Sequence, residues 1–430
     1  MLFIHGSLAM GGVETFILRM AKQRAAENKN TVIILLSAEH RSDSGLVMEA
    51  RKYARVLFLP DITSLPRLIS RYFPFHLSLL LPIRTDLGKY LKDVTHVHAT
   101  CGISAYFYAH IAKHLPANVK FTIGVYHSLE FCWGTPQLPY FERKNRELFF
   151  DKVSKSSIIF FNESMVPLYE KVSGQSFQAV NLFPLGVIEP SFPDLKQISQ
   201  LRESSSSLKL VSVGRLVPFK TYNLHMIDVV ASLLKDGIAV VYDIYGDGPL
   251  EPEMKKKISE QGLQKHINLK GILNYDRFSE VVSSYDVFIG SGSAIIQAAG
   301  LGVSAIVGIE NIVSAETYGF LAELDGFSYN EDGLYAKKPL VAVLESYSKL
   351  PIAERISLSQ RHIDKAKEFS MAQCVDNFDR TPHYSLDAKS VFGRFSFFVR
   401  LCYSASLFMS SLRARLSNRS LSEQVRENNI

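Results

Sequence analysis

Short apolar runs alternate with stretches of helical character along the first half of the chain. Continuous apolar runs between helices are typical of a parallel sheet that is buried on both faces. The pattern therefore predicts a doubly wound α/β domain. Its expected strands are Leu2 to Ile4, Val32 to Leu36, Val56 to Leu59, Val94 to Val97, Phe121 to Val125 and Ser157 to Phe161.

The alternation stops between Pro190 and Leu208, where prolines, a charge cluster and four consecutive serines have the composition of a linker. It then resumes, and the expected strands are Leu208 to Val213, Val240 to Tyr245, Asn268 to Lys270, Val287 to Ile289 and Ala305 to Val307. Two Rossmann-like domains facing across a cleft are predicted. Open α/β sheets bind ligands at the carboxyl ends of their strands, so the cleft is the expected site.

A chain of 430 residues is long enough for two full cores. We predict a first domain over 1–187, a second over 188–375 and a helical basic and aromatic tail over 376–430. In the tail, residues Ser390 to Arg419 mix aromatic, aliphatic and arginine side chains and contain no acidic residue. This mixture predicts either an amphipathic helix in a membrane interface or a helix packed on the first domain.

Composition excludes few functions, but it indicates the class of protein and the compartment. Hydrophobic residues make up 47% and charged residues 21% of the chain, as in a folded globular protein. A net charge of +6 gives no argument for a nucleic acid partner. The four cysteines form no close pair, and no apolar run is long enough to span a bilayer, so a reduced cytoplasmic protein is expected.

The segment VSVGRLVPFKTYN places two cations directly after a strand. The strand ends at Gly214, and Arg215 and Lys220 follow in the loop. Such a pair suits a phosphate, with Arg215 as a planar fork and Lys220 as a point charge. The alternative interpretation is a surface turn with two solvated cations.

The segment DVFIGSGSAIIQAAGLGVSAIVG has only glycine and small side chains at the start of a helix. A helix start offers unpaired backbone N–H groups, and glycine removes the side chain that would keep an anion away. Gly292, Ser293 and Ala294 are therefore candidates for a diphosphate cradle. The neighbouring IYGDGPLEPEM is interpreted as an ordinary connection between a strand and a helix.

The first domain offers two weaker candidates. Gly11 and Gly12 open a helix expected over Val13 to Ala25, where they either admit a ligand or form a tight turn. His127 follows a strand, and histidine titrates near neutral pH, although a single histidine is more often structural.

Taken together, GGVETF, VYHSLEF, VGRLVPFKTYNL, IYGDGPLEPEMKK, HINLKGIL and SSYDVFIGSGSAIIQAAGLGVSAIV resemble the family 4 retaining glycosyltransferases of GT-B fold. The resemblance covers roughly residues 1 to 380 and is stronger in the second domain. It implies transfer of a sugar from a nucleotide donor, UDP- or GDP-linked, with no cofactor and no metal. The acceptor is expected mainly at the first domain.

The resemblance also implies roles. Arg215 and Lys220, after Gly214, correspond to the pair that neutralises the donor diphosphate; Gly12, beside Gly11, to a backbone donor; and His127 to a histidine near the transferred sugar. The family's E-x7-E motif is altered: Gln297 stands at the second glutamate, which usually holds the ribose, and the first has no counterpart.

The leading hypothesis is a glycosyltransferase of surface polysaccharide assembly that acts on a saccharide or lipid-linked acceptor, with possible membrane contact through 390–419 at the inner face of the membrane. Acceptor specificity is expected in first-domain loops such as TCGISAYFYAH and EFCWGTPQLPYFERKNREL. One alternative is a sugar-nucleotide epimerase, for which no motif is found. The other is a degenerate GT-B protein that binds a nucleotide or a partner without transfer.

Overall fold

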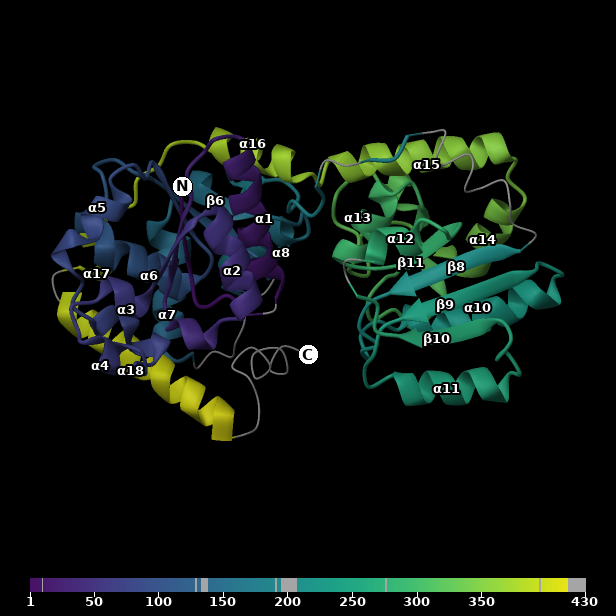
Figure 1. Ribbon diagram of the computed structural model, residues 1–430, viewed down its shortest axis with the longest axis horizontal. Helices are drawn as coiled ribbons and strands as arrows, with labels where there is room; N and C mark the ends of the chain where they lie inside the picture. The colour runs from purple at the N-terminus through teal and green to yellow at the C-terminus, as the bar shows by residue number, and fades with distance from the viewer. Residues whose placement is uncertain are drawn as a thin grey trace. The chain divides into compact units, whose positions relative to one another are not determined.

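The computed structural model describes residues 1–127, 130–132, 138–189, 192–194, 207–274, 277–393 and 396–416, except residue 10. Most of the expected linker, and part of the tail segment 390–419, lie outside these ranges. The chain divides into two compact units (Figure 1). The first comprises Met1–Leu185 and Val375–Ile430, and the second Gly186–Cys374.

A parallel sheet of seven strands forms the centre of the first unit, in the order β3-β2-β1-β4-β5-β6-β7. Its strands are β1 Leu2–His5, β2 Val32–Leu35, β3 Arg55–Phe58, β4 His96–Ala99, β5 Lys120–Val125, β6 Ile158–Phe160 and β7 Asn181–Leu182. Every residue of β2, β4, β5 and β6 is buried, as expected for strands covered by helices on both faces. The short β7 was not predicted from the sequence.

Helices cover both faces of this sheet (Figure 1). They are α1 Gly12–Ala26, η1 Glu39–Arg41, α2 Ser44–Tyr53, α3 Leu59–Ile62, α4 Arg67–Ser70, η2 Phe75–Leu80, η3 Thr85–Leu87, α5 Gly88–Leu91, α6 Gly102–Ile111, η4 Ala112–His114, α7 Tyr140–Arg146, η5 Glu147–Lys152, η6 Lys155–Ser157 and α8 Met165–Ser173. The segment TCGISAYFYAH is not a loop. It forms α6, whose residues are buried except His110, so it belongs to the core instead of an acceptor loop.

The second unit also has a central parallel sheet, with five strands in the order β10-β9-β8-β11-β12. The strands are β8 Leu208–Val213, β9 Val240–Tyr245, β10 Ile267–Gly271, β11 Val287–Gly290 and β12 Ser304–Val307. The helices are α10 Tyr222–Lys235, α11 Glu251–Glu260, α12 Phe278–Val282, α13 Ser293–Gly300, η8 Leu321–Glu323, α14 Leu340–Ser348 and α15 Ile352–Lys367. A small antiparallel pair, β13 Glu316–Thr317 and β14 Lys338–Pro339, lies apart from the main sheet.

Three helices follow, α16 Met371–Arg380, α17 Ala388–Phe392 and α18 Ser396–Leu416, and the last two pack on the first unit. Tyr403 of α18 is fully buried and donates a hydrogen bond to Asn145 of α7 at 2.8 Å. Arg400 donates to the Leu79 carbonyl at 3.3 Å and to His110 Nδ1 at 2.9 Å. One face of α18 therefore belongs to the first unit.

Among the residues that the structure describes, no helix combines the length and apolar character needed to cross a membrane.

Candidate functional site

Two glycine-containing loops lie against each other at the carboxyl ends of β8 and β9. The Leu216 N–H donates to the Asp247 carbonyl at 2.7 Å, and the Leu250 N–H donates to the Leu216 carbonyl at 3.0 Å. A Cβ on Gly246, which has a φ of +144°, would lie 1.9 Å from the Gly214 carbonyl oxygen. Only glycine fits there, so these glycines fix the loop that carries the two cations.

Lys220 and Arg215 differ in their environment within that loop. Arg215 is exposed, whereas Lys220 is partly buried and its amine lies 3.0 Å from where a Cβ on Gly214 would be. Burial lowers the pKa of Lys220; Arg215 lowers it further, and the Glu310 carboxylate opposes both. A charged lysine that is partly desolvated gains from an added anion.

The start of α13 lies at the carboxyl end of β11, the strand next to β8. Gly292, the residue before the helix, has a φ of +67°, and no atom lies within 4 Å of where its Cβ would be. Its N–H donates to Asn330 Oδ1 at 3.0 Å, and its carbonyl accepts from the Tyr329 hydroxyl at 3.1 Å. Ser293 is exposed in the first turn, so an anion could approach the backbone here.

Glu310 and Asn330 belong to this site but were missed from the sequence. Glu310 follows the carboxyl end of β12 and accepts from the Ser291 hydroxyl at 2.7 Å. The Ser291 hydroxyl also lies 3.4 Å from the Tyr222 hydroxyl, in the first turn of α10. Glu310 could have been found by its position just after a predicted strand. Asn330 carried no such signal, since it lies 38 residues from the glycine that it caps.

Gln297 lies four residues after Ser293 on α13 and is partly buried. Residues four apart share one face of a helix, so Gln297 faces the same side as the exposed start of α13. An amide there can accept a hydrogen bond from a ligand hydroxyl, although more weakly than a carboxylate.

In the first unit, Gly11 precedes α1 in an extended conformation and Gly12 is its first residue. A Cβ on Gly12 would meet no atom within 4 Å, which leaves this backbone open. His5, at the end of β1, lies 2.7 Å from the Thr100 hydroxyl and 3.3 Å from Glu14 Oε1. Burial would raise the pKa of Glu14, but the His5 and backbone hydrogen bonds outweigh it and hold that pKa below its usual value.

His127 lies two residues beyond the end of β5 and is partly buried. The preceding Tyr126 places its hydroxyl 2.8 Å from His98 Nε2. Burial lowers the pKa of His98 to about 3, so that imidazole is neutral at physiological pH and acts as a hydrogen-bonding support.

The structure thus gathers the candidate residues into two groups, one in each unit. Gly214, Arg215, Lys220, Gly292 and Ser293 lie around the ends of the adjacent strands β8 and β11, with Ala294 and Gln297 on the helix that follows. Gly11, Gly12 and His127 follow β1 and β5, which β4 separates in the sheet.

Comparison with known proteins identifies the fold to which these two groups of residues belong. Residues 194–313 match the family model of glycosyl transferases group 1. No curated protein matches the chain. The glycosyltransferase from Rickettsia africae is 15% identical, with 91% of this chain and 98% of that chain covered and a TM-score of 0.57.

Two further solved structures are similar. HepE of Anabaena, in complex with UDP and glucose, is 13% identical, with 88% of this chain and 98% of that chain covered and a TM-score of 0.55. The sucrose-phosphate synthase of Thermosynechococcus elongatus is 11% identical, with the same coverage and a TM-score of 0.54. The predicted fold class is confirmed: two α/β units of the GT-B type, followed by helices.

Proposed function

We propose that the chain is a retaining glycosyltransferase of family 4 type that transfers a sugar from a nucleotide-sugar donor to a saccharide or lipid-linked saccharide. One observation carries the proposal. Inside the segment that matches the glycosyl transferase model, Lys220 and Arg215 follow β8 while the glycine-led start of α13 follows the adjacent β11. Two cations and a row of backbone N–H groups at one sheet edge suit a diphosphate.

In this proposal Lys220 and Arg215 stabilise the charge that grows on the leaving nucleoside diphosphate, so no metal or cofactor is required. Backbone N–H groups of Gly292, Ser293 and Ala294 bind its oxygens. Asn330 holds one of these groups at 3.0 Å and gives way when the donor binds.

Gln297 binds the ribose hydroxyls in place of the family's second glutamate. Glu310 has two parts in the proposal: it attracts Lys220 and keeps its ammonium near the cradle, and it fixes the Ser291 hydroxyl at 2.7 Å. The structural support is that Glu310 follows β12, next to β11, where it accepts the Ser291 hydrogen bond, and that its charge raises the pKa of Lys220.

The first unit is assigned to the acceptor. No atom lies within 4 Å of where a Cβ on Gly12 would be, so the Gly12 backbone N–H is assigned to a phosphate of the donor. Gly11 lets the chain enter α1. His127 positions the transferred sugar by hydrogen bonding.

The proposed donor nucleotide, pathway and cellular location rest on analogy with solved structures. HepE was crystallised with UDP and with UDP-glucose, and WaaB, which has a TM-score of 0.51 to this chain, is a galactosyltransferase of the lipopolysaccharide outer core. A UDP- or GDP-linked donor, a role in surface polysaccharide assembly and work at the cytoplasmic face of the membrane follow by analogy.

A second candidate, a degenerate protein that binds a nucleotide without transfer, is favoured by one observation: Gln297 is neutral where the family has a carboxylate. A mass-spectrometric screen against UDP- and GDP-sugars decides between the two. We expect slow donor hydrolysis with one donor class, abolished in Arg215→Ala and unchanged in the matched variant Lys209→Ala, at the opposite end of β8. Nucleotide binding without turnover of any donor would favour the second candidate.

A further inference from the structure

The outward face of α18 is mostly apolar. Its exposed apolar residues are Phe397, Phe398, Leu401, Ala405, Phe408, Met409, Leu412 and Leu416, and Arg413 is exposed among the last of them. Phe397 and Phe398 are 64% and 63% exposed, and Leu416 is 80% exposed. The opposite face buries Tyr403 and Leu407 in the first unit. A helix that is apolar on both faces normally has a partner on each, so the outward face is expected to bind something.

The apolar face of α18 continues across two hollows to α4. Phe408 and Leu412 line one hollow with Arg41, Pro74 and His76, where the His76 and Phe408 rings lie 6.3 Å apart.

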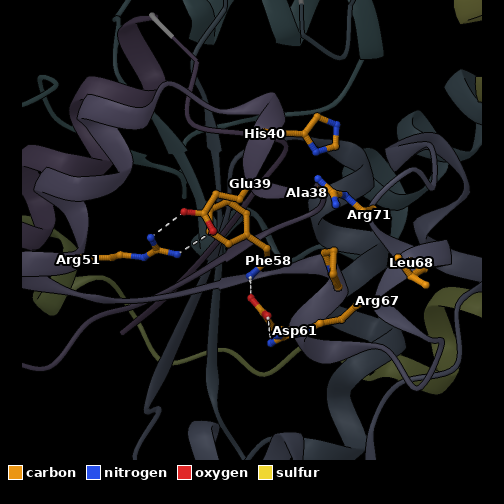
Figure 2. Close-up of a pocket in the computed structure, with 10 residues that line it drawn as sticks. Ala38, Glu39, His40, Arg51, Phe58, Asp61, Arg67, Leu68 and Arg71 are labelled. Atoms are coloured by element: carbon orange, nitrogen blue, oxygen red, sulfur yellow. Dashed lines mark hydrogen bonds and ion pairs between the residues drawn. The ribbon is translucent and has the colours of Figure 1, made fainter.

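The residue before Arg41, His40, lines the next hollow, a pocket of about 410 Å³ shared with Arg67, Leu68 and Arg71 (Figure 2). Leu68, which lines this pocket, is 79% exposed, and the nearby Ile69 and Tyr72 are also exposed. One surface therefore runs from α18 to α4.

Positive charge accompanies this surface. Figure 2 shows the two carboxylates of the pocket, Glu39 and Asp61, already held by Arg51 and Arg67. No ion pair is drawn for Arg71, whose guanidinium lies 5.2 Å from the Tyr72 ring. Exposed aromatic and aliphatic side chains beside arginines are the pattern of a surface that enters an anionic lipid interface.

We propose that the outward face of α18, together with α4 and η1, docks on an anionic membrane, with the apolar side chains among the acyl chains and Arg41 and Arg71 at lipid phosphates. A second copy of the chain fits less well. An isologous contact through this face would bring its cations near their own copies, whereas lipid phosphates neutralise them.

The inference rests on the proposed function, because a lipid-linked acceptor is held at a membrane, but its test is separate. The full chain is sedimented with vesicles of phosphatidylcholine, with and without phosphatidylglycerol. We expect binding only with the anionic lipid, and weaker binding at high salt. Arg41→Gln with Arg71→Gln should weaken binding roughly 30-fold, since each arginine near the surface contributes about fivefold.

The apolar contribution is tested by Phe398→Ser with Leu412→Ser, two exposed positions. We expect loss of vesicle binding with an unchanged melting temperature. The controls Ile272→Ser and Val313→Ser, which replace more exposed apolar residues of the second unit, should bind as the parent does.

Three results overturn the docking proposal: equal binding to neutral vesicles, an equal loss in the controls, or a parent dimer that the α18 variant converts to monomer. Donor hydrolysis is measured on the same samples. Vesicle binding without hydrolysis would sink the proposed function and leave the docking surface standing; hydrolysis without vesicle binding would do the reverse.

Discussion

Replacing Lys220 with methionine separates the chemistry of the site from its stability. Methionine keeps most of the volume and removes the charge that we assign to the leaving diphosphate. In the free protein, burial lowers the pKa of Lys220, so the charged form is disfavoured by its surroundings. The lysine therefore contributes little to folding and, by our assignment, much to the transition state.

The expected magnitudes follow from that contrast. Loss of one preorganised charge-assisted contact raises the barrier by about 2 to 4 kcal/mol, a fall in rate of about 30- to 1,000-fold. The free energy of unfolding should change by less than about 1 kcal/mol, because the mutation removes a partly desolvated charge, while the Glu310 carboxylate that attracts it keeps its hydrogen bond from Ser291.

The coupling between protonation of Lys220 and binding of UDP gives a second signature of the lysine's charge. The pKa of Lys220 is lowered in the free protein, and a bound diphosphate raises it. UDP binding should thus take up a proton in the alkaline range, and affinity should be full at neutral pH and fall as pH rises through the free-state pKa. In Lys220→Met this alkaline fall should disappear.

The assay is donor turnover, calorimetry with UDP across pH, and thermal unfolding. Lys209→Met is the matched control, since Lys209 is exposed at the amino end of the same strand. Normal turnover in Lys220→Met, or an equal loss in the control, would refute the assignment of the donor site. A large drop in melting temperature would refute the stability argument.

Three further predictions concern other parts of the chain. Gln297→Glu should keep or raise UDP affinity by calorimetry, because a carboxylate accepts hydrogen bonds from a diol more strongly; a loss beyond about tenfold places Gln297 outside the ribose site. Burial raises the pKa of Glu142 to about 8, so its folded form holds a proton that the unfolded chain releases, and stability is lost as pH rises toward 8. Glu142→Gln, which can keep the hydrogen bond from Asn145, should raise the melting temperature more at pH above 8 than near pH 5. Gly246→Ala should lower the unfolding free energy by about 2 kcal/mol or more, since its Cβ would meet the Gly214 carbonyl; an unchanged melting temperature would contradict this.

Local pattern was enough for the strands and for several helices. β8 and β9 begin and end where the apolar runs Leu208 to Val213 and Val240 to Tyr245 do. Buried parallel strands need continuous apolar residues, and this requirement is visible in the chain itself. The helix start after Gly292 was also foreseen, and α1 starts at Gly12, one residue before the expected Val13, because glycine and small residues mark such starts locally.

The contacts between distant segments came only from the tertiary structure. Sheet order places β12 beside β11 and so brings Glu310 to Ser291, and no local pattern placed Asn330 at the Gly292 N–H. The tail composition allowed two interpretations, and the packing of Tyr403 and Leu407 on the first unit decided which face of α18 is left outward. Periodicity records which residues share a face of one element, whereas the partner of that face depends on how the elements are ordered in space.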